Sequence, residues 1–333
     1  MRTARRGVFD EEHEAFRDSV ARFLTEQAVP NRDRWDSEGI DAEFWTVAAG
    51  YGFLGLAEAG DPRFAAVVLE EAMAAGLPAV ALSLAAHESF VELAGREVRG
   101  LLAMVDGGAL RAEALGAAWV LDGTAETVIN GGGAGLLLVT VTDGVSELLF
   151  TVEPDAAGLH RSPADALLGL ESCDVADLRL EAVTAADRLD TDPTAARTAH
   201  QLALAVAAMA GARTALADTV VYVKQRKAFG RAIAEFENTQ RVLAGVGARV
   251  TAVGAYVDGC LGNAARLSPA DAVAAKFCAA DVLALAVDSG VQLHGGYGYM
   301  WEYPIARAYA AAPFFRLHAS AGEHSLLAGA VGL

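Results

Sequence analysis

The sequence predicts a mostly helical α+β protein in which a small β-domain separates two helical domains. Apolar residues recur every three or four positions up to about residue 106, and they form short runs broken by Gly, Asp and Pro between residues 107 and 186. Helical spacing returns from residue 187 onward. We therefore predict an N-terminal helical domain over residues 1–106, a reduced β-domain over 107–186 and a C-terminal antiparallel four-helix bundle over 187–333.

The N-terminal segment has the pattern of several amphipathic helices. Phe16, Val20, Phe23 and Leu24 lie at three- and four-residue intervals, and Pro30 ends this first pattern. Two or three further helices are expected over the apolar segments 41–55, 63–76 and 81–95.

The middle segment has the pattern of short strands. Runs such as LLLVTV and ELLFTV are separated by a Thr-Asp-Gly turn signal, which is typical of a hairpin. At ordinary strand lengths the segment has room for five or six strands.

The last segment predicts three long helices with short connections. Asp192-Pro193 and Ser268-Pro269 each combine a capping residue with a first-turn proline, which is typical of a helix start. The first helix is expected to end near Gly230, and the third near His294. Helices of roughly 25 to 35 residues would be about 40 to 50 Å long. Their single apolar stripes favour an antiparallel bundle.

The composition excludes several classes of function. A formal net charge of −17 argues against binding to nucleic acid or to an anionic membrane. Three cysteines without CxxC spacing indicate neither a disulfide framework nor a metal site. Acidic residues follow the N-terminal arginines where a secretory signal needs an apolar run, so we expect a cytoplasmic protein. The most apolar stretch, LALAVAAMAGA, is too short for a membrane span and is interpreted as core.

Two segments of the predicted bundle contain residues suited to hold a dinucleotide. Arg226 carries a permanent, forked charge that matches a diphosphate, and Phe229 offers a flat apolar face to a ring system. Gly295 and Gly296 allow a ligand to approach the backbone closely, and Gln292 presents an amide about one turn earlier. From the residues alone, a helix C-terminal charge and an ordinary turn are the simpler interpretations.

These segments, YVKQRKAFGRAIAEFENTQRVLA and VQLHGGYGYMWEYPIAR, resemble the two signatures of the acyl-CoA dehydrogenase family, in order and in spacing. The resemblance implies flavin-dependent α,β-dehydrogenation of an acyl-CoA substrate, with FAD as cofactor and electron-transfer flavoprotein as electron acceptor. It also implies that the matching residues bind the FAD of a neighbouring subunit. These residues are Arg226, Phe229, Gln292, Gly295 and Gly296.

The catalytic base of the family has no match in this sequence. Most members carry it as the glutamate of a Tyr-Glu-Gly-Thr segment, which corresponds here to His318 and Ala319. Other members carry the base early in the first bundle helix, at a position that falls near His200. We therefore assign no catalytic residue, while Glu323, Glu237 and His200 stay open as a relocated base.

The β-domain lacks a second family feature. The loop with which members hold their own flavin has no room between LLAMVDGGALRAEALG and Trp119, and the flavin-facing tryptophan falls at Leu136. The pattern resembles the short non-catalytic subunit of bacterial heterotetramers, which often act on steroid side-chain CoA esters. The resemblance thus implies a catalytic partner subunit with which FAD is shared. A self-sufficient dehydrogenase and a flavin-free CoA-ester-binding or scaffold protein are the alternatives.

Overall fold

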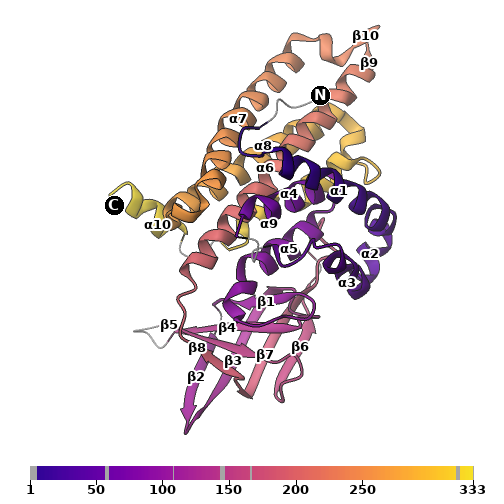
Figure 1. Ribbon diagram of the computed structural model, residues 1–333. Coiled ribbons are helices and arrows are strands. Elements are labelled where there is room, and N and C mark those ends of the chain that lie inside the picture. Colours follow the sequence, from indigo (N-terminus) through magenta and orange to yellow (C-terminus); the bar gives the residue numbers. More distant parts are fainter. Residues whose placement is uncertain are drawn as a thin grey trace.

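The computed structural model describes residues 6–56, 60–107, 109–142, 147–165, 167–319 and 323–332. Two helical regions form one body, and the sheets lie at its lower end (Figure 1). The predicted order of helical domain, β-region and helical bundle is confirmed.

The described part of the N-terminal region contains five α-helices. Asp10 caps the first by accepting hydrogen bonds from the backbone N–H groups of Glu12 and His13, and Pro62 and Pro78 occupy first-turn positions of the fourth and fifth. The helices are α1 (Glu11–Gln27), α2 (Arg32–Glu38), α3 (Ala42–Gly50), α4 (Pro62–Ala74) and α5 (Pro78–Phe90), with short 3-10 helices at Val29–Asn31 and Val91–Ala94.

The β-region contains two four-stranded sheets. The first has the order β1-β4-β5-β8 and consists of Leu102–Val105, Leu136–Thr142, Glu147–Val152 and Asp187–Leu189, with β1 and β4 parallel. The second is antiparallel with the order β2-β3-β7-β6 and consists of Ala109–Leu115, Ala118–Ile129, Val175–Thr184 and Leu159–Pro163. Leu121, Val139, Phe150 and Val183 pack together in a common core. Six of these strands lie within the predicted segment, and β1 and β8 flank it.

The bundle is built on the long helix α6 (Thr194–Gln225), which is buried along most of its length. Its apolar side chains pack against α4, α5 and α8, and Gly211 provides space for Met73 and Leu283. The other elements are α7 (Glu237–Gly262), α8 (Pro269–His294), α9 (Pro304–Leu317) and α10 (Glu323–Ala330). A two-stranded hairpin, β9 (Lys227–Ala228) and β10 (Arg231–Ala232), joins α6 to α7, and 3-10 turns lie at Ile233–Glu235, Ala264–Arg266 and Gly295–Tyr299.

By length and composition alone, α6 could cross a membrane, and 61% of its most apolar window is buried inside the protein. The helix continues on both sides of the apolar stretch recognised in the sequence. Its buried position is that of a core helix.

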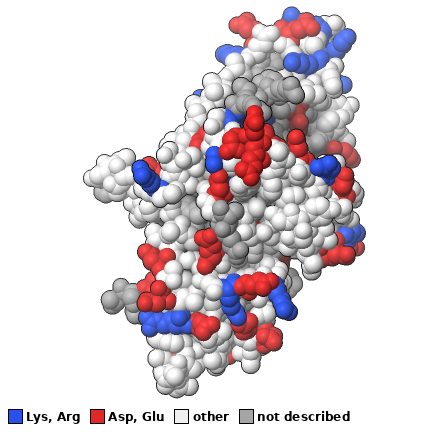
Figure 2. All heavy atoms as spheres, viewed as in Figure 1, with Lys and Arg blue, Asp and Glu red and all other residues white. Residues whose placement is uncertain are grey.

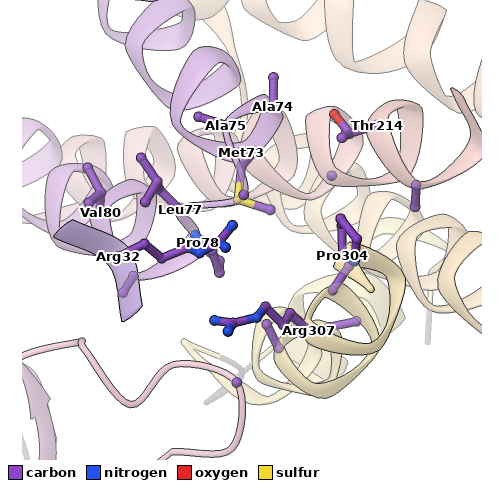
Figure 3. A pocket seen from close by; sticks show the side chains of 18 of the residues that line it. Arg32, Met73, Ala74, Ala75, Leu77, Pro78, Val80, Thr214, Pro304 and Arg307 are labelled. Atoms are coloured by element: carbon purple, nitrogen blue, oxygen red, sulfur yellow. The ribbon is translucent and has the colours of Figure 1, made fainter. Parts of the chain in front are cut away.

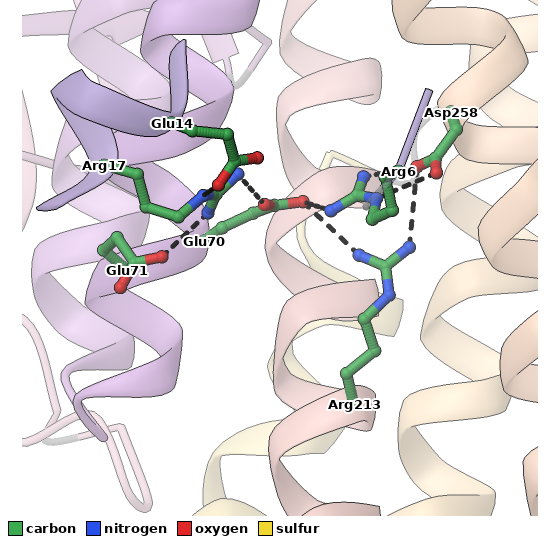
Figure 4. Close-up of polar contacts among 7 residues, drawn as sticks. All are labelled: Arg6, Glu14, Arg17, Glu70, Glu71, Arg213 and Asp258. Atoms are coloured by element: carbon green, nitrogen blue, oxygen red, sulfur yellow. Dashed lines mark hydrogen bonds and ion pairs between the residues drawn. The ribbon is translucent and has the colours of Figure 1, made fainter. Parts of the chain in front are cut away.

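A network of charges joins Arg6 to the four helices α1, α4, α6 and α7 (Figure 4). The carboxylate of Glu70 on α4 is buried and pairs with Arg6, with Arg17 at 2.9 Å and with Arg213 at 3.3 Å. Arg6 and Arg213 both also pair with Asp258 on α7. Each charge therefore has an opposite partner, as buried charges require. The network fixes α1, α4, α6 and α7 relative to one another.

Candidate functional site

The residues predicted to hold a dinucleotide lie at the free end of the bundle, which we call the bundle tip and define by Arg226, Phe229, Gln292, Gly295 and Gly296. Arg226 follows the last residue of α6 in an extended backbone conformation, so the chain leaves the helix there and forms the β9–β10 hairpin. Figure 1 shows this hairpin at the end of the molecule farthest from the sheets.

Phe229 lies in the turn of the hairpin, with an exposed side chain and a left-handed backbone conformation. Its side chain is 96% exposed, and its φ of 51° lies in the left-handed region. A bulky residue rarely adopts this conformation, and Gly230 with φ of 82° follows it directly. Folding gains little from such a side chain, so its presence points to a role outside this chain.

Aromatic contacts bring the two signature segments together. The rings of Tyr222 on α6 and His294 on α8 are stacked with centroids 3.9 Å apart, and the Tyr222 hydroxyl donates a hydrogen bond to the His294 carbonyl at 3.1 Å. The guanidinium of Arg226 lies 5.3 Å from the ring centroid of Tyr297. The ends of α6 and α8 therefore form one surface.

The glycine-rich turn after α8 is open to a ligand at two positions. Gly295 has a φ of 61°, and a Cβ atom at Gly295 or Gly296 would meet no heavy atom within 4 Å. By contrast, a Cβ at Gly298 would lie 2.4 Å from the carbonyl oxygen of Val291, so that glycine is needed for packing. Gln292 is exposed on the last turn of α8, where its carbonyl accepts the Gly295 N–H.

At the N-terminal end of α6 the fold brings together the two places where the family resemblance locates a base. His200 lies on the second turn of α6, and its Nε2 is 3.2 Å from Nε2 of His318, which follows α9. Nδ1 of His200 is 3.2 Å from the carbonyl oxygen of Ala85. Because a carbonyl only accepts, Nδ1 of His200 carries the proton, and its Nε2 accepts from His318.

Burial holds both imidazoles in the neutral form. Desolvation lowers the pKa of His200 to about 4, and desolvation together with the neighbouring His200 and Lys276 lowers the pKa of His318 to about 3. A group with so low a pKa takes up a proton poorly at neutral pH. The Nε2 of His200 is also engaged by the other ring, so this histidine is poorly suited to abstract a substrate proton.

Ala319 is held in place through its backbone. It has a φ of 56°, and its carbonyl accepts a hydrogen bond of 2.7 Å from the Gln201 side-chain amide. The side chain at this position is a methyl group, which offers no proton acceptor.

The other two candidate bases serve different roles. Glu323 is buried and accepts a hydrogen bond of 2.6 Å from the ammonium group of Lys276, which also donates to the Arg316 carbonyl at 3.1 Å. Glu237 is exposed and begins α7. From His200 to the end of α6 the helix continues for roughly 37 Å at about 1.5 Å per residue, so Glu237 lies far from the histidine pair.

The β-region is short at the place where the family resemblance locates the flavin-holding loop. Strand β2 ends at Leu115 and β3 begins at Ala118, so only Gly116 and Ala117 connect them. Leu136 on β4 is buried in a cluster with Phe90 and Leu102. Its side chain therefore faces the protein core.

Acidic side chains gather in several clusters on the face shown in Figure 2, with wide uncharged areas between them. Among the residues that the structure describes, no group of three His, Cys, Asp or Glu side chains could hold a metal ion.

Comparison with known proteins gives the family. The family model for the acyl-CoA dehydrogenase N-terminal domain matches residues 10–95, and the model for the C-terminal domain matches residues 175–324. The long-chain specific acyl-CoA dehydrogenase of Sus scrofa mitochondria is 30% identical, with 91% of this chain and 82% of that protein covered. This chain belongs to the acyl-CoA dehydrogenase family, whose members carry out flavin-dependent dehydrogenation of acyl-CoA.

Solved structures agree on the fold. An acyl-CoA dehydrogenase from Geobacillus kaustophilus superposes with a TM-score of 0.88 at 24% identity, covering 99% of this chain and 100% of that one. A glutaryl-CoA dehydrogenase from Mycobacterium smegmatis, solved in complex with FADH2, has a TM-score of 0.88 at 17% identity, covering 98% and 95%.

Several residues of the site were not found from the sequence. Neither Gln201 nor Lys276 is among the residues singled out from the sequence. The pairing of His200 with His318 spans 118 positions of the chain. No local pattern reveals such a contact, although a lysine on an otherwise apolar helix face signals a buried partner.

Proposed function

We propose that this chain is a non-catalytic subunit of a heteromeric acyl-CoA dehydrogenase, in which it completes the FAD site of a catalytic partner subunit. The observation that carries the proposal is the contrast between the two ends of the bundle. The tip exposes a cation, an aromatic ring and an open glycine turn, whereas the opposite end has an alanine and a neutral histidine pair where the base is expected.

The state of the three candidate bases supports the proposal. Removing an α-proton from an acyl thioester needs a base within hydrogen-bond reach and with a suitable pKa. His200 has a strongly lowered pKa, Glu323 is paired with Lys276, and Glu237 lies at the other end of α6. None of them therefore presents a free basic group at the place where the base is expected.

The bundle tip fits the outer part of a dinucleotide. Arg226 presents a charged, forked donor suited to a diphosphate, and the exposed ring of Phe229 suits stacking on an aromatic base. When bound, FAD supplies the hydride acceptor for the family's reaction. In this proposal, the isoalloxazine is held mainly by the partner, because Gly116 and Ala117 alone connect β2 to β3 and leave no room for a flavin loop here.

The proposal extends to the setting of the complex. We propose a cytoplasmic heterotetramer that passes electrons to electron-transfer flavoprotein and acts on steroid side-chain CoA esters. The substrate part is tested by comparing steroid side-chain and straight-chain CoA thioesters as substrates of the pair.

The decisive experiment purifies this chain alone and together with a co-expressed full-length homologue that has the catalytic glutamate. We expect one FAD per pair, and dehydrogenase activity only in the pair. A yellow and active homo-oligomer of this chain would refute the proposal and favour a self-sufficient enzyme. Failure of every preparation to retain flavin would instead favour a scaffold or CoA-ester-binding protein.

A matched pair of variants tests the role of the tip. Arg226→Gln should lower the FAD content of the purified pair, because it removes the charge facing the diphosphate. Lys224→Gln removes an exposed cation two positions earlier, in the last turn of α6, and should leave the FAD content unchanged. Equal FAD content in both variants would contradict the assignment of Arg226.

A further inference from the structure

A cavity of about 180 Å³ lies between the N-terminal helices and the bundle. Neither the histidine pair nor any residue of the bundle tip lines it. Its walls come from α2, the α4–α5 turn, α6, α8, α9 and the β6–β7 connection. Their large apolar members include Trp35, Met73, Leu77, Leu283, Trp301, Ile305 and Phe315. Because an apolar cavity of about 150 Å³ is enough to bind benzene, this one can hold a compact body of about six carbon atoms.

The cavity exists because small residues line it where helices meet. Gly76, Gly211, Ala215, Ala308 and Ala311 all contribute to its surface. The large side chains around them are fixed: Leu283 and Ile305 are 2% exposed, and Phe315 is 1% exposed. Tightly packed helices of this kind do not collapse into a void, so the space persists in the folded protein.

Two arginines approach the cavity from opposite walls (Figure 3). Arg307 on α9 is neutralised, because it donates hydrogen bonds to Asp36 at 2.8 Å and to Asp33 at 3.1 Å. Arg32 on α2 has one ion pair among the described residues, from Nε to Asp33 at 3.3 Å. Its Nη1 lies 3.7 Å from the position of a Cβ on Gly76. The outer nitrogens of Arg32 thus remain available at the cavity edge.

Among the described residues, none of the acidic side chains that line the cavity pairs with Arg32, whose single ion pair is with Asp33. Asp36 is bound by Arg307, and Glu171 accepts a hydrogen bond of 2.9 Å from the Gly169 N–H. Asp218 lies one turn beyond Thr214 on α6. Figure 3 shows Thr214 on the wall opposite Arg32, so Asp218 belongs to that opposite wall.

We propose that this cavity binds a small monocarboxylate, with its apolar body among the α4–α5, α6 and α9 side chains and its carboxylate on the Arg32 guanidinium. This chemistry follows from an apolar interior with one available cation at its edge, since a guanidinium and a carboxylate form two parallel hydrogen bonds. The site is separate from the proposed FAD contact, and it requires neither flavin nor a partner subunit. An experiment that refutes carboxylate binding at this site therefore leaves the proposed function untouched, and the reverse also holds.

The test titrates the full chain with cyclohexanecarboxylate and with the neutral analogue cyclohexylmethanol, followed by tryptophan fluorescence and by NMR contacts to the Met73 methyl group. We expect the carboxylate to bind at least about tenfold more tightly than the alcohol. Arg32→Gln should remove this preference, and Arg34→Gln, an exposed arginine on the same helix that does not line the cavity, should keep it.

A third variant tests the cavity itself. Ala308→Leu places a larger side chain on its wall and should weaken binding of both compounds, while circular dichroism checks that the variant folds. Equal binding of acid and alcohol by the unchanged protein, the same loss in both arginine variants, or ligand contacts that bypass Met73 would each overturn the proposal.

Discussion

Replacing Glu323 by alanine should destabilise the protein by about 3 to 5 kcal/mol, because it leaves a buried lysine without its charge partner. The side chains of Lys276 and Glu323 are 1% and 5% exposed, and the ion pair is 2.6 Å long. The Arg316 carbonyl would be the remaining partner of the ammonium group, at 3.1 Å. One neutral acceptor does not compensate for the desolvation of a full charge.

The size of the effect depends on which partner is removed. Lys276→Met alone leaves a buried carboxylate and should be similarly destabilising. The double variant Lys276→Met/Glu323→Leu removes both charges and should lie within about 1 kcal/mol of the unchanged protein, or above it. The two single changes are therefore expected to be strongly non-additive.

Urea unfolding at pH 7 measures these differences. The ion pair Arg316–Asp281 is a matched control, because its side chains are 53% and 48% exposed. Asp281→Asn should therefore lower the free energy of unfolding by less than about 1 kcal/mol. A loss below about 1 kcal/mol for Glu323→Ala would show that water reaches Lys276 and that the buried pair is not a structural contact. Glu323 would then again be a candidate base.

Three other predictions follow from single contacts. Gly169→Ala should lower the free energy of unfolding by about 2 to 4 kcal/mol, because Gly169 has a φ of +75° and a Cβ there would lie 2.6 Å from the Ala311 nitrogen. Thermal unfolding measures the change, and an unchanged melting temperature would contradict this geometry. The pKa of His200 is about 4 and that of His318 about 3, so between about pH 6.5 and 4 the unfolded state binds more protons than the folded state. The free energy of unfolding should therefore fall with falling pH by about 1.4 kcal/mol per pH unit for each ring. Urea titrations across this range should show a flatter slope for His318→Gln. Phe229→Gly should leave the stability of the chain equal or higher, because it relieves the left-handed backbone, yet reduce FAD retention by the pair; normal retention would separate Phe229 from the proposed site.

Much of the fold could be predicted from local patterns. Helical spacing located α1, and cap-plus-proline pairs located the starts of α6 and α8, because helix formation depends on neighbouring residues. The domain limits remain a prediction, and the strands of the two four-stranded sheets extend from Leu102 to Leu189. The short strands β1 and β8 were missed because an edge of three or four residues carries too little pattern.

The candidate site divides in the same way. The residue types and spacing of Arg226, Phe229, Gln292 and the glycine turn are local properties, and the sequence alone identified them and the family. The absence of a carboxylate at position 319 is likewise a fact of the sequence.

Only the tertiary structure decided what occupies the place of the missing base. The hydrogen bond between His200 and His318, the buried pair of Lys276 with Glu323, and the inward direction of Leu136 all depend on contacts between residues far apart in the chain. Burial sets the pKa of an imidazole and the strength of an ion pair, and burial is a property of the packed whole. For this reason the sequence could name the chemical groups, and the fold alone determined their protonation and their partners.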